Sequence, residues 1–156
     1  MKAATVKEIK AALENLPPQE LLPLTLRLAR FKKENKELLT YLLFDASDER
    51  GYVESVKSAV DELFFYINHS NLYYVKKTLR KILRMISRYA RYSDHSQTEV
   101  ELLIYFCQKI KEKAIPLEKS TALVNLYAGQ LKKISREIKA MHEDLQYDFQ
   151  KELDKL

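Results

Sequence analysis

The sequence predicts an all-α protein of about seven helices, and three observations carry that prediction. Glycine and proline are scarce, with two and four residues among 156, which leaves little material for the tight turns of β-hairpins. Apolar residues recur at helical spacing along most of the chain. Residue types that begin and end helices lie between these apolar stripes. We therefore expect a single all-helical domain over residues 1–156, an antiparallel bundle or a short stack of helical hairpins with a long C-terminal helix.

Three helices are predicted in the first 44 residues. The first begins at Thr5, whose hydroxyl can cap it while Glu8 reaches back, and it ends at Pro17. The second takes Pro18 into its first turn, and Pro23 is expected to distort its start. The third spans 35–44. The apolar faces expected to pack are Val6, Ile9, Leu13 and Leu16, then Leu21, Leu24, Leu28 and Phe31, then Leu38, Leu39, Leu42 and Leu43.

The polar stretch DASDERG at 45–51 is the clearest predicted loop, and it is also where a hinge is expected. The helix after it, from about Tyr52 to Asn68, has a full apolar stripe and leaves Phe65 on the opposite side. Phe65 is therefore expected to face another helix or a partner.

The stretch from Leu72 to Tyr92 holds the positive balance of the chain. It has seven basic residues and no acidic one, while the rest of the chain has twenty basic and twenty-two acidic residues. At about 100° per residue, its aliphatic side chains fall on one arc and its bases on the opposite arc. Such a basic arc can bind phosphates, with tyrosine rings as stacking platforms. The candidate phosphate-binding or partner-binding residues are Lys77, Arg80, Lys81, Arg84, Arg88, Arg91, Tyr73 and Tyr92.

Other interpretations explain the same pattern. The basic arc can be a solvated helix face, or it can pair with an acidic neighbour such as the helix that holds Glu54, Asp61 and Glu62. No helix-turn-helix is recognisable, so specific reading of a duplex is not expected. Binding to an anionic membrane surface is a weaker alternative, because the core is expected to use the apolar arc.

The C-terminal half is predicted to contain the central helix and the longest one. The segment from Leu102 to Cys107 is apolar nearly all round, and Ser96 with Glu99 forms a predicted capping box before it. After Pro116, one helix of about 34 residues, about 50 Å long, is expected to run to the C-terminus. Its coiled-coil-like seam either pairs with a second copy or lies across shorter helices. The candidate interface residues are Phe65, Met141, Leu145 and Phe149.

Three segments resemble those of a group of uncharacterised all-helical bacterial proteins. They are KENKELLTYLLF at 33–44, QTEVELLIYFCQKI at 97–110 and HEDLQYD at 142–148. The shared features are packing patterns rather than catalytic signatures. The resemblance therefore implies a helical fold, and it implies no activity, ligand or catalytic residue.

Sequence signatures of the common enzyme classes are absent. The chain has no Glu-x-x-His pair, no His-Glu-x-x-His, no glycine-rich phosphate loop and no Gly-x-Ser-x-Gly elbow. His142 with Asp144 or Asp148 is the one weak candidate for a metal site. Cys107 is expected to be a core residue rather than a nucleophile. We therefore expect neither an enzyme nor a cofactor.

These patterns favour a non-enzymatic helical module that binds a protein partner, self-associates, or does both. Nucleic-acid binding through the basic helix at 72–92 is the alternative. A single cysteine, and the lack of an apolar run of about 18 residues, predict a cytoplasmic protein without membrane insertion.

Overall fold

The computed structural model describes all residues, 1–156, and divides into two compact units, Met1–Phe44 and Asp45–Leu156. It contains eight α-helices and no strand, so the predicted all-α class is confirmed. The predicted loop at 45–51 is shorter than expected, because a helix already begins at Glu49. None of the helices combines the length and the hydropathy that a membrane crossing requires.

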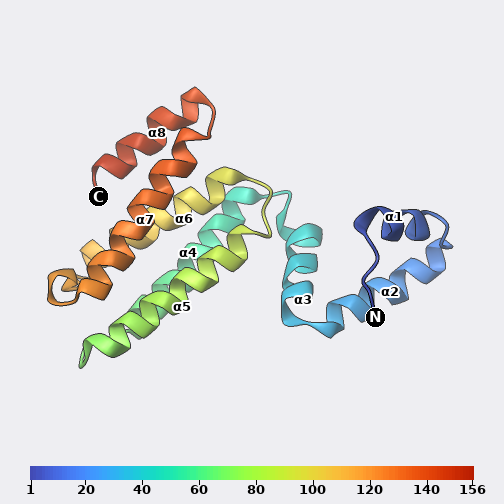
Figure 1. Ribbon diagram of the computed structural model, residues 1–156, viewed down its shortest axis with the longest axis horizontal. Helices are drawn as coiled ribbons and strands as arrows, with labels where there is room; N and C mark the ends of the chain where they lie inside the picture. Colours follow the sequence, from blue (N-terminus) through green and yellow to red (C-terminus); the bar gives the residue numbers. More distant parts are fainter. The chain divides into compact units, whose positions relative to one another are not determined.

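Three short helices make up the first unit (Figure 1). They are α1 (Val6–Glu14), α2 (Pro18–Phe31) and α3 (Lys33–Thr40), which continues into a π-helical turn at Tyr41–Asp45. The predicted capping box is present, since Thr5 and Glu8 exchange hydrogen bonds at the start of α1. α2 and α3 pack on each other, and the Asn35 side chain donates a 2.8 Å hydrogen bond to the carbonyl of Leu28. This bond gives a partner to a carbonyl in the last turn of α2.

The apolar faces of these three helices are present but not buried. No residue of α1, α2 or α3 is buried, and Tyr41 in the π-helical turn is the only buried residue of 1–44. The prediction that α2 buries Leu24, Leu28 and Phe31 is therefore wrong: these side chains are exposed.

Five helices make up the second unit. They are α4 (Glu49–Phe65), α5 (Leu72–Ala90), α6 (Ser96–Glu112), α7 (Thr121–Lys139) and α8 (Glu143–Asp154), with a 3-10 turn at Leu117–Lys119. α4, α5 and α6 pack on one another as one three-helix bundle, and α6, α7 and α8 pack as a second. Both bundles share α6, which explains why Leu102, Phe106 and Cys107 are fully buried on it. The predicted central helix is thus confirmed.

The predicted long C-terminal helix is wrong, because the chain reverses after α7 and α8 folds back along it (Figure 1). The backbone of His142 is extended there, with φ −62° and ψ 147°. The side-chain amide of Gln146 donates a 2.7 Å hydrogen bond to the carbonyl of Met141, so a carbonyl in the turn is satisfied. Glu143 and Asp144 in the first turn of α8 favour a new helix start, because the positive end of the helix dipole lies there.

This reversal places most of the predicted interface inside the second unit. Met141 is buried, and Leu145 and Phe149 are half-buried. Phe149 lines a shallow pocket with Ile104 and Gln108 of α6. The C-terminal seam therefore packs against the unit's own helices and does not project.

The start of α6 also differs from the prediction. Glu99 does not cap the helix, because its carboxylate lies 2.5 Å from Nζ of Lys133 on α7. Instead, the hydroxyl of Ser93 accepts a 3.1 Å hydrogen bond from the backbone N–H of His95 just before the helix. Glu99 thus contributes to packing between α6 and α7.

Candidate interaction surfaces

α5 is one unbroken two-sided helix, as the sequence predicts. Val75, Leu79, Ile82 and Ile86 are buried, and they lie on the side that packs against α4 and α6. Asn71 caps the helix, since its side chain accepts a 2.8 Å hydrogen bond from the backbone N–H of Tyr73. The apolar stripe fixes the rotation of α5, and its basic arc is therefore turned away from the bundle.

Four cations on this outward side are exposed, and none of them forms an ion pair. They are Lys77, Arg80, Lys81 and Arg84, which we call the basic face. Arg91, just after the helix, is exposed as well. The residues of the basic face lie within eight positions of one another, so their charges add on one side of the helix.

Pairing of the basic face with the acidic residues of α4 does not occur. Glu54 lies 2.8 Å from Nζ of Lys57 on the same helix, and Asp61 lies 3.2 Å from Nζ of Lys109 on α6. Lys57 also holds Glu101 of α6 at 2.6 Å. The carboxylates Glu54 and Asp61 are thus paired along α4 and between α4 and α6, and neither pairs with the basic face.

Two of the predicted binding residues, Arg88 and Tyr92, are less exposed than the basic face. The Arg88 guanidinium is half-buried and lies 5.1 Å from the ring centre of Tyr89. Tyr92 is half-buried too, and its ring centre lies 5.9 Å from that of Tyr89. Neither side chain is as accessible to a ligand as the four cations of the basic face.

Four exposed aromatic rings stand at one end of the α4–α5 hairpin. Phe65 and Tyr66 end α4, and Tyr73 and Tyr74 begin α5; we call these four residues the aromatic tip. They are 75%, 72%, 59% and 46% exposed, respectively. Each pair is T-shaped, with ring centres 5.1 Å and 5.4 Å apart. The sequence predictions included Phe65 and Tyr73 but missed Tyr66, although its place beside the outward-facing Phe65 was an available signal.

The first unit exposes most of its large apolar side chains. Eleven of them, besides Met1, are exposed: Val6, Ile9, Leu22, Leu24, Leu26, Leu28, Phe31, Leu38, Leu42, Leu43 and Phe44. The second unit exposes only two such residues that lack a hydroxyl group, Phe65 and Val124. Sequence periodicity identified these apolar faces, but not their exposure.

An apolar groove lies where α2 and α3 pack together. Its lining residues are Leu26, Ala29, Arg30, Lys36, Leu39, Thr40, Leu43 and Phe44, which we call the apolar groove. A second depression shares Ala29 and Leu39 and adds Leu28, Leu38 and Leu42. Ala29 and Leu39 therefore line both depressions. Arg30 and Lys36 have no ion-pair partner.

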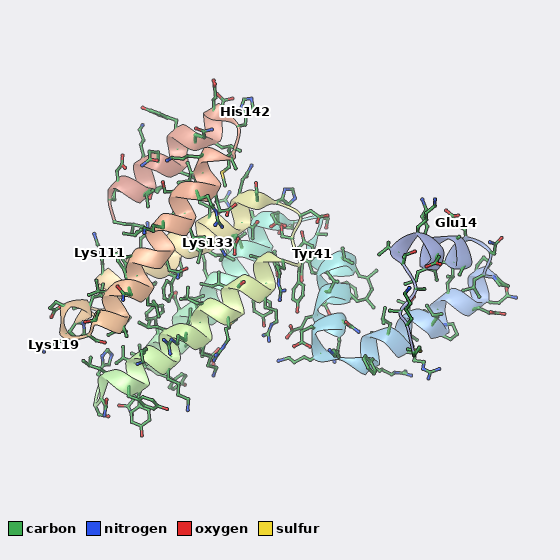
Figure 2. The ribbon with its side chains drawn as sticks, in the orientation of Figure 1. Glu14, Tyr41, Lys111, Lys119, Lys133 and His142 are labelled. Carbon is green, nitrogen blue, oxygen red and sulfur yellow. The ribbon has the colours of Figure 1, made fainter.

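No group of three or more histidine, cysteine or acidic side chains is close enough to hold a metal ion. His142 lies at the turn between α7 and α8 (Figure 2), with Nδ1 3.5 Å from the carboxylate of Asp144. Both side chains are mostly exposed. Burial raises the pKa of the Cys107 thiol to about 12, so this thiol is protonated at neutral pH.

No protein-family model, curated protein or solved structure matches the chain. The features that bear on function are therefore the exposed surfaces, namely the basic face with the aromatic tip, and the apolar groove.

Proposed function

We propose that this protein is a non-enzymatic interaction module whose first unit binds an amphipathic helix of a protein partner in the apolar groove. The observation that carries the proposal is that α1, α2 and α3 bury no residue while eleven large apolar side chains of 1–44 are exposed. Apolar surface of this extent is unusual on a protein that binds nothing, because its contact with water is unfavourable.

The shape of the apolar groove favours a helical partner. Leu26, Ala29 and Leu39 line the apolar groove between α2 and α3, and Leu43 and Phe44 of the π-helical turn after α3 add to its apolar lining. A small side chain at position 29 leaves room for a larger apolar side chain from a partner. Amphipathic helices insert apolar side chains at intervals of three or four residues into grooves of this kind.

The charge beside the groove favours an acidic partner helix. Arg30 of α2 and Lys36 of α3 line the groove, and no carboxylate of this chain pairs with them. Glutamates or aspartates beside the apolar stripe of a partner helix could form ion pairs with both cations. Complementary charge of this kind increases association rate and selects between partners.

The proposal is tested with the full chain and two synthetic amphipathic peptides. Both carry leucines at helical spacing; one has glutamates and the other lysines beside the leucine stripe. Fluorescence anisotropy should show binding of the glutamate peptide and at least about tenfold weaker binding of the lysine peptide. Leu43→Ser with Phe44→Ser should weaken the glutamate peptide by about tenfold or more, since both side chains are exposed and line the groove.

Val124→Ser is the matched control, because Val124 is an exposed apolar residue of α7 outside the groove. This variant should bind as the unaltered chain does. Equal loss in both variants, or binding of neither peptide, would contradict the proposal. Sedimentation that shows a dimer abolished by Leu43→Ser would instead identify a second copy as the occupant.

A further inference from the structure

We infer that the α4–α5 hairpin binds single-stranded nucleic acid through the basic face and the aromatic tip together. The aromatic tip stands at the joined ends of the two helices, and the basic face continues from it along α5. This site lies in the second unit and uses no residue of the apolar groove. It is therefore independent of the function proposed above.

The order of residues along α5 places a ring and three cations in one row. Tyr73, Lys77, Arg80 and Arg84 follow one another at intervals of four, three and four residues, which puts them on one helix face. The row rises about 17 Å at about 1.5 Å per residue. A row of this length can contact several successive phosphates of one strand.

The charge of the row is available to phosphates. Lys77, Arg80 and Arg84 are exposed and free of carboxylate partners, so no internal ion pair has to break when a phosphate binds. Lys81 beside the row adds a fourth cation. Neutralising phosphates with such cations releases counterions from the strand, which makes binding favourable and dependent on salt.

The aromatic tip favours a single strand over a duplex. Bases of a single strand can leave their neighbours and stack on protein rings, whereas bases of a duplex stay stacked on one another. Tyr73 and Tyr74 expose their rings beside the basic face, and Phe65 and Tyr66 expose theirs at the end of α4. Stacking on rings and ion pairs with phosphates are available to every base, so little sequence preference is expected.

An anionic membrane surface fits these features less well. The aliphatic stripe of α5, including Leu79 and Ile86, is buried in the bundle and cannot insert into lipid. Aromatic rings beside cations, without an accessible aliphatic stripe, match the surfaces that bind single strands.

The first experiment measures affinity of the full chain for fluorescent oligo(dT) and oligo(U) over a salt titration. Lys77→Ala with Lys81→Ala should weaken the affinity for both oligonucleotides by about tenfold. It should also reduce the magnitude of the slope of log affinity against log salt concentration by about 1.4, for two lost phosphate contacts. Lys132→Ala with Lys139→Ala removes two exposed lysines from α7 and should leave affinity unchanged. Equal losses in the two double variants would overturn the site, because they would show that only net charge matters.

The second experiment tests stacking at Tyr73. Tyr73→Leu should weaken oligo(dT) by about tenfold, whereas Tyr73→Phe should bind like the unaltered chain, because phenylalanine keeps the ring. Tyr73 is exposed at the start of α5, and circular dichroism of each variant checks that the helices are retained. If Tyr73→Leu keeps full affinity for oligo(dT), bases do not stack on this ring and the proposed role of the aromatic tip is wrong.

Two further ligands distinguish binding of a single strand from binding of a duplex or of a membrane surface. A duplex of the same length should bind at least about tenfold more weakly than the single strand, and vesicles of equal parts phosphatidylcholine and phosphatidylglycerol should not compete with oligo(dT). Tighter binding of the duplex, or of the vesicles, would overturn the inference. The groove variant Leu43→Ser with Phe44→Ser should keep its affinity for oligo(dT), so failure of either proposal can be recognised separately.

Discussion

The hydroxyl of Tyr105 on α6 donates a 2.7 Å hydrogen bond to Oδ2 of Asp61 on α4. The other oxygen of the same carboxylate lies 3.2 Å from Nζ of Lys109. Asp61 thus joins α4 to α6 through two partners. Since the carboxylate is held there, it does not neutralise α5, and this helps to explain why the basic face keeps its full positive charge.

Asp61→Ala should lower the free energy of unfolding by about 1 kcal/mol, because it removes one hydrogen bond and one partly exposed ion pair. The loss is limited because Lys109 keeps Glu112, whose carboxylate lies 3.0 Å away and is the main reason that the pKa of Lys109 is raised. Urea denaturation measures this change. Affinity for oligo(dT) should stay within about twofold of the unaltered chain, and a large gain would show that Asp61 does shield α5.

The contact between Phe64 and Phe106 holds the centre of the first three-helix bundle, with ring centres 5.9 Å apart. Phe106 is fully buried on the shared helix α6. Phe106→Ala should therefore destabilise the chain by about 3 to 5 kcal/mol through lost burial and a cavity. Phe65→Ala is the matched control: this ring is 75% exposed, and its removal should cost less than about 0.5 kcal/mol. Similar losses of stability in the two variants would contradict the burial described for α6.

Cys107 should make stability depend on pH in the alkaline range. Burial raises the pKa of its thiol from 9.0 to about 12 in the folded state. Between these two values the unfolded chain releases the thiol proton and the folded chain keeps it, so stability from this residue falls as pH rises. The stability difference between the unaltered chain and Cys107→Ala should therefore shrink above pH 9.0. A stability difference that stays constant to about pH 11 would contradict the prediction. At neutral pH, the buried thiol should also resist thiol reagents until the chain unfolds.

Burial could be predicted for helices whose apolar and charged residues are clearly separated, or whose residues are apolar on nearly all sides. In α5 the aliphatic stripe from Val75 to Ala90 and the basic arc lie on opposite sides, so the burial of one side could be predicted. In α6 the run from Leu102 to Cys107 has no polar side, so a helix covered on most sides could be predicted.

Sequence reasoning failed where the outcome depends on contacts between distant segments. Met141 and Leu145 both pack inward on either side of the turn after α7, so the four-and-three spacing continues across a chain reversal and does not reveal it. Periodicity also shows which side chains share a helix face, but not what covers that face. The exposure of Phe31 and Leu43 in the first unit could therefore not be predicted from their spacing.

The two glycines of the chain should respond in opposite ways to alanine. Gly129 lies inside α7, and a Cβ added there meets nothing within 4 Å. Gly129→Ala should therefore stabilise the chain by about 0.5 to 1 kcal/mol, because alanine loses less conformational entropy in a helix than glycine does. Urea denaturation followed by circular dichroism measures this gain.

At Gly51, an added Cβ would lie 2.3 Å from Oδ2 of Asp48, the residue that caps α4. The Asp48 carboxylate would have to move and give up its 3.0 Å hydrogen bond from the backbone N–H of Gly51. Loss of such a cap costs about 1 kcal/mol, which offsets the helical gain, so Gly51→Ala should be neutral or destabilising. Asp48→Ala should cost about 1 kcal/mol in the unaltered chain and close to nothing beside Gly51→Ala, because the cap is then already lost. Equal stabilisation by both glycine substitutions, or full additivity at Asp48, would contradict this coupling.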